Sequence, residues 1–536
     1  MTSPHSPFHP IIYVRGYAMT QAEIDQTTAD PFCGFNLGST TYRAVAERNR
    51  PPRKFVFESP LVRLVSEFGY QDVYQGGYDI LDAEWQDNPA NRLSSRSIII
   101  HRFYDQASSL LGLGEPPSLA NFASRLGELI MRVRELVCDN PDNGIGKEDF
   151  RCYLVAHSMG GLVCRGLLQN PLHDPLGAAR HVAKLFTYAT PHNGIEMLGV
   201  NPPSWLNLNA IDSFNRDKLA TFFGLEQAYA RHGRVDLLPQ ERYPSEQVFC
   251  MVGTNRLDYE AALGLSRTFV GHGSDGLVRI ANATLQSLDA HGELAQPCAK
   301  AFAYRSHSGF FGLVNSEEAY QNLVRFLFGD VRVDLWLDIE AISLPAPVDT
   351  AQRAGRQVNA LYQIETLAAP RGKLWYLTRR TAEEDSVTCL SHQDWLHDPQ
   401  RHGIRYLSSV FLARRAKVNH HDDSLTYTMT LNVRVPDYEI ERTLWVDQHF
   451  EGSYLFRNAL LLKLFPARDN DPDAWRLEYA WQDQGLNQAL KPLTPSVRAD
   501  GKLQVSVPFD SRSTPGIKGQ LRLVLSAWNG DAQLRE

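Results

Sequence analysis

The chain of 536 residues has few cysteines, no block of like charge and no long apolar run. Its seven cysteines are widely spaced and form no Cys-x-x-Cys pair, which indicates reduced, mostly buried thiols rather than a disulfide framework. The formal net charge is −7 without a basic block, so nucleic-acid binding is not expected. No apolar run of about eighteen residues occurs, and a transmembrane helix is therefore not expected.

The first ten residues contain neither a basic segment nor an apolar one, so a secretory signal peptide is not expected. Without such a peptide, a cytoplasmic location is the expectation. Export by a route that needs no signal peptide stays open.

The length favours two domains, which we place at residues 1–330 and 331–536. In the first, short apolar runs alternate with helical patterns, of which residues 118–136 are the longest. Strands separated by helices predict a parallel sheet covered on both faces. The apolar runs lie at residues 11–14, 97–100, 152–156, 183–188 and 247–252.

In the second domain, apolar and polar residues alternate with a period of two, as in the run from Val331 to Ile339. The same period recurs at residues 425–435, 503–509 and 521–525. This pattern is typical of antiparallel sheet with one buried face, and it predicts a C-terminal β-sandwich.

The segment Ala156-His157-Ser158-Met159-Gly160-Gly161 follows an apolar strand and precedes a helix. A sharp strand-to-helix turn needs small residues two places before and after the serine, here Ala156 and Gly160, so that the hydroxyl is raised above the sheet. The pattern predicts Ser158 as a nucleophile. The alternative is a tight turn in which Ser158 only caps the helix.

An earlier strand, residues 11–14, ends at Arg15-Gly16-Tyr17. Gly16 would let the backbone turn beneath a substrate, and the backbone N–H groups of Tyr17 and Met159 would form an oxyanion hole. The alternative is that Gly16 is an ordinary strand-ending glycine.

Asp275, in Gly273-Ser274-Asp275-Gly276, is the best candidate for the acid of a triad, although an Asp-Gly turn is common in loops. His307 follows a short strand and is the best candidate for the base. His192 and His272 are the alternatives. The order Ser158, Asp275, His307 is the order that this strand-turn-helix nucleophile requires.

These motifs resemble the lipase branch of the α/β-hydrolase superfamily, and residues 1–330 are similar to bacterial lipases and to GPI inositol-deacylase-like hydrolases. Two departures are Arg15, where lipases usually have histidine, and Ala156, where glycine is usual. The resemblance implies that lipid carboxylic esters are cleaved through an acyl-enzyme, without a cofactor. The motifs that carry it are residues 14–17, 156–161, 189–194 and 274–278 together with His307.

The first hypothesis is therefore a lipid ester hydrolase, which would bind a lipid or ester and could touch a membrane peripherally. A phospholipase acting on membranes, for instance as a secreted antibacterial effector, is the second. The third is an inactive hydrolase domain that serves as a binding scaffold, with protein partners left open. The complete set of Ser158, Asp275 and His307 argues against this last reading.

Three further features allow weaker interpretations. The apolar residues near 195–240 would form a cap over an acyl pocket, or simply pack the core. His420-His421-Asp422-Asp423 has metal-ligand residue types, but we assign no metal to a polar hairpin tip. Five cationic residues would form a basic face on the sandwich, or they are simply solvated surface charges. These residues are Arg379, Arg380, Arg414, Arg415 and Lys417.

Overall fold

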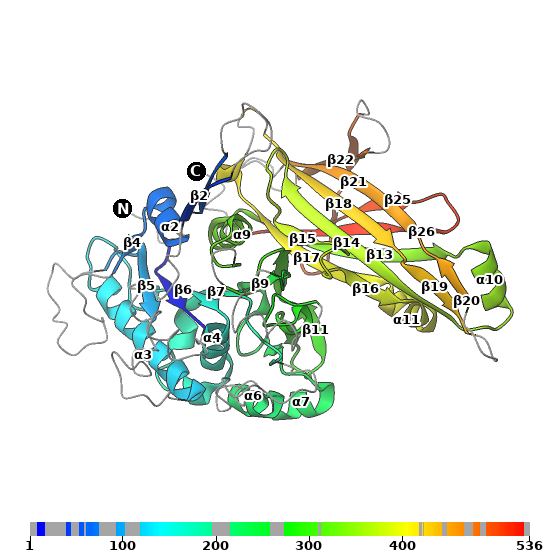
Figure 1. Ribbon diagram of the computed structural model, residues 1–536. Helices are drawn as coiled ribbons and strands as arrows, with labels where there is room; N and C mark the ends of the chain where they lie inside the picture. Colours follow the sequence, from blue (N-terminus) through cyan, green and yellow to red (C-terminus); the bar gives the residue numbers. More distant parts are fainter. Residues whose placement is uncertain are drawn as a thin grey trace. The chain divides into compact units, whose positions relative to one another are not determined.

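The computed structural model divides into two compact units (Figure 1). The first comprises residues 1–300 and 305–323, and the second residues 301–304 and 324–536. The structure describes residues 8–16, 39–43, 53–57, 60–73, 93–101, 118–195, 215–257, 273–308, 312–417, 421, 423–441, 448–465, 475–482 and 489–529. Tyr17, His272 and residues 196–214 of the expected cap lie outside these ranges.

A seven-stranded sheet with the order β12-β9-β7-β6-β1-β5-β4 forms the core of the first unit. The strand pairs from β9 to β4 are all parallel. Strands β1 and β6 are buried along their whole length, as apolar runs without alternation predict. The strands are β1 (Ile11–Val14), β4 (Gln71–Asp72), β5 (Ser97–His101), β6 (Cys152–His157), β7 (Val182–Tyr188), β9 (Val248–Gly253) and β12 (Ala299–Ala303).

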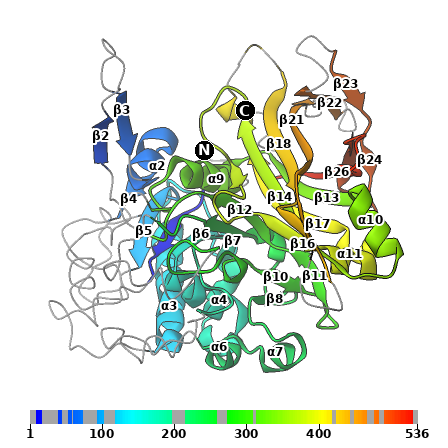
Figure 2. The same ribbon diagram turned by 45° about the vertical axis from the view of Figure 1, so that its right-hand side comes forward.

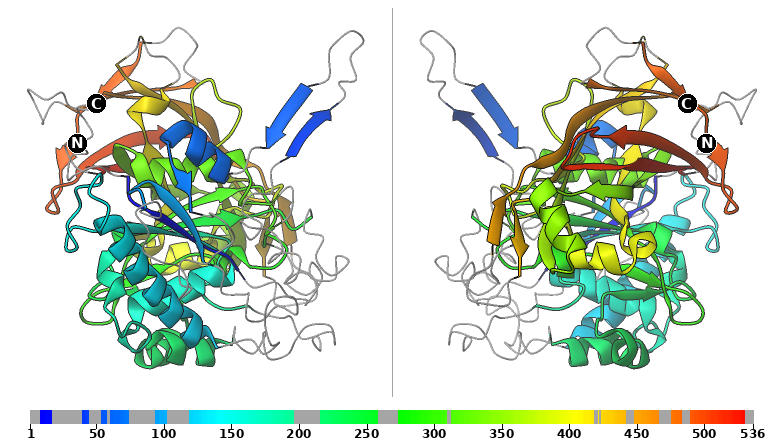
Figure 3. Two further views of the ribbon diagram at one scale, coloured as in Figure 1. Left: turned by 90° about the vertical axis from the view of Figure 1, so that its left-hand side faces the viewer. Right: turned by 90° about the vertical axis from the view of Figure 1, so that its right-hand side faces the viewer.

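Helices cover both faces of this sheet. On one face, α3 (Leu119–Cys138) and α4 (Met159–Gln169) bury their apolar stripes against the strands, and the hydroxyl of Ser118 caps α3 by accepting from the Asn121 N–H. The left panel of Figure 3 shows the cyan α3 lying across the blue strands.

On the other face, α2 (Pro60–Phe68) and α9 (Glu317–Phe328) pack together, with the Arg63 guanidinium 3.6 Å from the ring centre of Tyr320. In Figure 2, α3 and α4 lie below the strands, and α2 and α9 lie above them. A parallel sheet with helices on both faces is the architecture predicted from the sequence, and the structure confirms it.

Two short helices follow the expected cap region. In α6 (Arg216–Phe223), Leu219 and Phe223 are buried, and they cluster with Leu225 and with Leu162 of α4. The buried side chains of α6 and Leu225 thus pack in an apolar cluster, as the second of the two interpretations of this region expects, whereas α7 (Glu226–His232) has no buried residue. The remaining elements of this unit are the three-stranded sheet of β8 (Leu237–Pro239), β10 (Gln286–Leu288) and β11 (Leu294–Pro297), and the hairpin of β2 (Ser39–Arg43) and β3 (Arg53–Phe57).

The second unit contains two largely antiparallel sheets. The smaller has the order β17-β13-β26-β25-β24, and the larger has the order β20-β19-β14-β18-β21-β22-β23, with β15 and β16 also paired to β14. The smaller sheet consists of β13 (Val331–Ser343), β17 (Ile404–Leu412), β24 (Ser496–Val497), β25 (Leu503–Asp510) and β26 (Gly516–Ala527). The larger sheet consists of β14 (Val358–Pro370), β15 (Thr378–Arg380), β16 (Thr388–Ser391), β18 (Leu425–Arg434), β19 (Asp437–Ile440), β20 (Gln448–Glu451), β21 (Tyr454–Phe465), β22 (Arg476–Trp481) and β23 (Lys491–Leu493).

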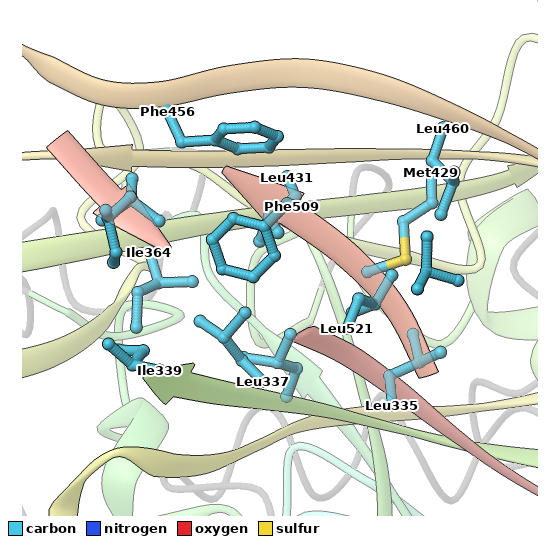
Figure 4. Packing of buried hydrophobic residues seen from close by; sticks show 14 of the residues in the cluster. Leu335, Leu337, Ile339, Ile364, Met429, Leu431, Phe456, Leu460, Phe509 and Leu521 are labelled. Atoms are coloured by element: carbon cyan, nitrogen blue, oxygen red, sulfur yellow. The ribbon is translucent and has the colours of Figure 1, made fainter. Parts of the chain in front are cut away.

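A single apolar core lies between these two sheets (Figure 4). Leu335 and Leu337 of β13 face Ile364 of β14 and Met429 and Leu431 of β18 across it. This packing confirms the predicted sandwich. Three short helices that the sequence pattern did not predict accompany it: α10 (Ala346–Arg353), α11 (His392–His397) and α12 (Pro399–His402).

The alternation in β13 predicts that Arg332 and Asp334 face solvent, but both are buried. The Arg332 Nε lies 3.0 Å from a carboxylate oxygen of Asp334, so the two charges compensate each other where the aromatic rings of Phe411 and Trp528 pack.

In the described parts of the chain, no helix combines the length and the apolar character needed to cross a membrane.

Candidate active site

Ser158 sits at the sharp turn between β6 and α4. Its backbone has φ 53° and ψ −126°, a combination that costs energy for a residue with a side chain. The Tyr188 carbonyl holds the turn by accepting from the Ser158 N–H at 2.9 Å. Such a strand-serine-helix elbow on a parallel sheet is the hallmark of the α/β-hydrolase fold, which is the fold of the first unit.

Two glycines allow the backbone to pass close to this turn. A Cβ atom on Gly16 would lie 2.3 Å from the Ser158 Cβ, and one on Gly160 would lie 2.1 Å from the Val14 carbonyl oxygen. Both distances are far below van der Waals contact. The segment after β1 therefore runs directly against Ser158, where an oxyanion-hole loop belongs.

His307 lies in the loop between β12 and α9. Its Nε2 is 3.0 Å from the Ser158 Oγ, and its Nδ1 is 2.9 Å from the Asp275 Oδ2. The three groups that the sequence singled out are thus joined by two hydrogen bonds. All three side chains are buried.

The Asp275 carboxylate is held by its own loop. Its Oδ1 accepts the backbone N–H groups of Leu277 and Val278 at 3.0 and 2.7 Å, which leaves Oδ2 for His307. The Asp275 carbonyl also accepts the His307 N–H at 3.0 Å. Backbone and side-chain contacts together fix the imidazole relative to the carboxylate.

His157 supplies a contact that the sequence did not predict. Its Nε2 lies 3.0 Å from the His307 carbonyl oxygen, and the two rings are 5.0 Å apart. Burial, followed by the charges of His307 and Arg15, lowers the pKa of His157 well below the usual value. The neutral ring must therefore carry its proton on Nε2 and donate it to the carbonyl.

Of the two backbone donors predicted for an oxyanion hole, one belongs to a described residue. Met159 is the first residue of α4, so its backbone N–H is among those that have no partner within the helix. Tyr17, the other expected donor, lies outside the described residues.

Of the two alternative histidines, His192 makes no hydrogen bond to Ser158. His192 is fully buried, its Nε2 lies 3.2 Å from the Thr187 Oγ1, and burial holds its pKa well below the usual value. His272 lies outside the described residues.

Arg165 of α4, which belongs to none of the predicted site motifs, holds the loop around His192. Although it is buried, its guanidinium donates to the carbonyls of His192, Val235 and Leu237 at 2.9 to 3.0 Å. Burial lowers its pKa to about 9. An arginine within an apolar helix pattern is the signal that could have revealed this role.

Metal-ligand residue types gather at one place in the described chain, far along the sequence from the triad. The His449 Nδ1 lies 3.6 Å from a carboxylate oxygen of Asp437 and of Glu439. The imidazole and Asp437 are exposed, and a surface ion pair accounts for the arrangement.

No family model and no curated protein matches the chain. Among solved structures, the mature lipase BlEst2 of Bacillus licheniformis is 13% identical, with a TM-score of 0.27, over 52% of this chain and 80% of that one. Phospholipase PlaB of Legionella pneumophila is 12% identical, with a TM-score of 0.32, over 82% of this chain and 90% of that one. The lin2722 product of Listeria innocua is 12% identical, with a TM-score of 0.25, over 60% and 94% of the two chains.

Proposed function

We propose that this chain is a serine hydrolase of carboxylic esters. The observation that carries the proposal is the unbroken pair of hydrogen bonds from the Ser158 Oγ to His307 and from His307 to Asp275, at 3.0 and 2.9 Å. The strained elbow at Ser158 supports it, because backbone strain that is retained at a turn is typical of a reactive site.

In the proposed reaction, the His307 Nε2 takes the proton of Ser158 as its Oγ attacks the ester carbonyl. The Asp275 carboxylate keeps the His307 proton on Nδ1 and stabilises the imidazolium that forms. The negative charge on the carbonyl oxygen is met by backbone N–H groups, of which that of Met159 is one. His307 then returns the proton to the leaving alcohol, and water hydrolyses the acyl-enzyme through the same histidine.

The substrate class that we propose is a lipid ester. The support is the resemblance of the motifs around Ser158, Asp275 and His307 to those of lipases. The first unit thus supplies the chemistry of ester cleavage.

Labelling of the full chain with a fluorophosphonate tests the catalytic proposal. The wild type is expected to be labelled on Ser158, and Ser158→Ala is expected to lose both label and turnover while keeping its melting temperature. His307→Gln should lose labelling as well, whereas His192→Gln should keep it. A wild-type chain that resists the reagent would overturn the proposal and favour a binding scaffold.

Substrate class is tested by a series of p-nitrophenyl esters and by phosphatidylcholine vesicles. A lipid ester hydrolase is expected to prefer acyl chains longer than acetyl. Release of fatty acid from the vesicles by the wild type, but not by Ser158→Ala, would identify a phospholipase. Turnover of acetyl esters alone would contradict the proposed lipid substrate, but it would leave the proposed serine hydrolase mechanism intact.

A further inference from the structure

The turn between β14 and β15 exposes an apolar side chain almost completely. Leu374 is 97% exposed, more than any other large apolar side chain in the described parts of the chain. Single apolar residues on a surface are common and need no explanation. Leu374, however, belongs to a turn, residues 371–376, that combines it with two aromatic rings and two exposed cations.

The first half of this turn has a defined geometry. The Lys373 N–H donates to the Pro370 carbonyl at 3.1 Å, and Gly372 between them has φ 86°, the conformation that a type II turn needs at its third residue. The Arg371 N–H donates to the Thr426 carbonyl of β18 at 3.1 Å. The backbone that leads to the exposed leucine is therefore fixed to the larger sheet.

The two aromatic residues anchor the other half of the turn. Trp375 packs against the apolar core of the sandwich, and its ring centre lies 5.2 Å from the Arg325 guanidinium. The ring centre of Tyr376 lies 5.5 Å from the Arg379 guanidinium. Both aromatic side chains are half-buried and keep part of their surface exposed. Because Trp and Tyr are enriched at the boundary between membrane and water, this pair suits a segment that lies at that boundary.

The charge of the turn suits an anionic surface. Arg371 and Lys373 are exposed on either side of Gly372, and no aspartate or glutamate occurs between residues 366 and 382. Anionic lipids attract cations that lie close to a bilayer, and long cationic side chains can reach the phosphate groups while an apolar neighbour enters the lipid. The turn therefore complements an anionic lipid surface both in charge and in hydrophobicity.

The same end of the larger sheet carries a second aromatic and cationic pair. Phe465, the half-buried last residue of β21, lies opposite Arg476, the exposed first residue of β22. The Arg476 guanidinium is 4.8 Å from the ring centre of Phe465. Strand pairing brings the end of β14, the start of β18 and the end of β21 to one end of the sheet, where these strands lie side by side (Figure 1). The turn is thus part of a wider end of the same character.

Two residues of the basic face expected from the sequence are engaged by other residues of the second unit. Arg379 pairs with Glu384, and Arg380 donates to the carbonyls of Ser386 and Val387. The exposed cations of the turn are not among the five residues named for that face.

We propose that the turn of residues 371–376 docks the second unit onto an anionic lipid surface. Leu374 enters the bilayer, and Arg371 and Lys373 contact lipid phosphates. Docking does not depend on the reaction at Ser158. Its consequence, that the chain is held at the surface containing its substrate, rests on the proposed lipid ester substrate.

Co-sedimentation of the full chain with vesicles is the first test, with Ser158→Ala present so that no lipid is cleaved. Binding to phosphatidylcholine vesicles that contain phosphatidylglycerol is expected to be about fivefold or more stronger than binding to phosphatidylcholine alone. Added salt should weaken it, because salt screens exposed charges. Absence of binding, or equal binding to both kinds of vesicle, would overturn the proposal and leave the proposed hydrolase mechanism to its own test.

Leu374→Ser tests the apolar contact. Binding should weaken about tenfold or more, because a leucine side chain no longer leaves water. The matched control is Leu172→Ser, which removes a side chain that is 85% exposed in the first unit and stands beside His173 and Asp174. The control should bind within about twofold of the parent chain, and both variants should keep its melting temperature because both side chains are exposed. Equal losses in the two variants would contradict the proposal.

Arg371→Gln/Lys373→Gln tests the charge. Binding to the anionic vesicles should fall about fivefold or more, with little change on phosphatidylcholine alone. The control is Arg356→Gln/Arg512→Gln, which removes the same charge from exposed residues of the second unit outside the turn. Unchanged binding in the first double variant, or an equal loss in the control, would contradict the role of these two cations.

A second copy of the chain is the other partner that an exposed leucine could contact. Sedimentation velocity is expected to give the same oligomeric state for the parent chain and for Leu374→Ser. Self-association that Leu374→Ser abolishes, together with vesicle binding that it leaves unchanged, would make the turn a protein interface and overturn the proposal.

Discussion

The Nε2 of His157 lies 3.0 Å from the backbone carbonyl oxygen of His307, although the two residues are 150 positions apart in the sequence. The residue next to the proposed nucleophile thus holds the main chain of the proposed base. The His307 N–H is held on its other side by the Asp275 carbonyl at 3.0 Å. The contacts with His157 and Asp275 therefore fix the main chain of His307 and, with it, the position of the imidazole ring.

Removing this donor should impair alignment rather than binding. His157→Phe keeps a ring but loses the N–H, and a displacement of about 1 Å at a reacting group can cost about 100-fold in rate. We expect kcat to fall by about 10- to 100-fold with little change in KM, and His157→Gln, which retains an N–H donor, to recover much of the loss. Steady-state kinetics on a p-nitrophenyl ester measure both constants. A fully active His157→Phe variant would contradict the positioning role.

The loop around Asp275 makes Asp275→Asn a sharper test than alanine. The Oδ1 already accepts two backbone N–H groups, so an asparagine must place its carbonyl oxygen there and turn its NH2 group toward His307. The Nδ1 of His307 would then have to accept a hydrogen bond from this NH2 group, so the imidazole would carry its proton on Nε2. A protonated Nε2 cannot take the proton of Ser158.

The expected result is an intact fold with kcat lowered by about 10⁴-fold, as for an imidazole held in the wrong tautomer. Circular dichroism tests whether the fold is intact, and ester turnover measures kcat. Retention of more than a tenth of wild-type kcat would mean that Asp275 does not orient the base.

Gly16→Ala should separate activity from stability. Its new Cβ would lie 2.3 Å from the Ser158 Cβ and 2.8 Å from the His157 carbonyl oxygen, so the loop or the elbow must shift. We expect kcat to fall by more than 100-fold, on the scale that about 1 Å of misplacement costs. The control is Gly144→Ala, at φ +60° but with nothing within 4 Å. It should cost about 1–2 kcal/mol of stability and leave kcat unchanged.

Much of the fold could be predicted because its signals are local. The buried strands β1 and β6 are continuous apolar runs, and β13 alternates with the period of a half-buried strand. The positions of Asp275 and His307 after Ser158 could be predicted from the order of groups around such an elbow. Each of these predictions needs only a short stretch of sequence, or the order in which the nucleophile, the acid and the base follow one another along the chain.

The rest depends on partners that are distant in sequence. The period of two in β13 predicts an exposed Arg332, yet this side chain is buried beside Asp334, with its guanidinium 6.0 Å from the ring centre of Phe411 in β17. Likewise, Arg165 is buried in α4 because three carbonyls from two other segments accept hydrogen bonds from its guanidinium. The carbonyls around Arg165 and the ring beside Arg332 lie in other segments, so no local pattern identifies these contacts.

A buried histidine should make the second unit sensitive to acid. The His392 Nδ1 accepts from the Tyr362 hydroxyl at 2.6 Å, its Nε2 donates to the Gln352 Oε1 at 2.8 Å, and burial lowers its pKa to about 4. In the unfolded chain a histidine has a pKa of about 6.5. Between these values the unfolded chain binds a proton that the folded unit does not, so stability falls as the pH falls.

The loss from this one group is about 1.4 kcal/mol per pH unit below 6.5, or about 2 kcal/mol at pH 5. Urea unfolding followed by tryptophan fluorescence measures it, because most of the nine tryptophans lie after residue 324. His392→Gln should be less stable at pH 7 but flatter between pH 6.5 and 4. The control is His397→Gln, an exposed residue of the same helix, which should keep the wild-type slope. Equal slopes for His392→Gln and the wild type would show that His392 gains its proton in the folded unit as readily as in the unfolded chain.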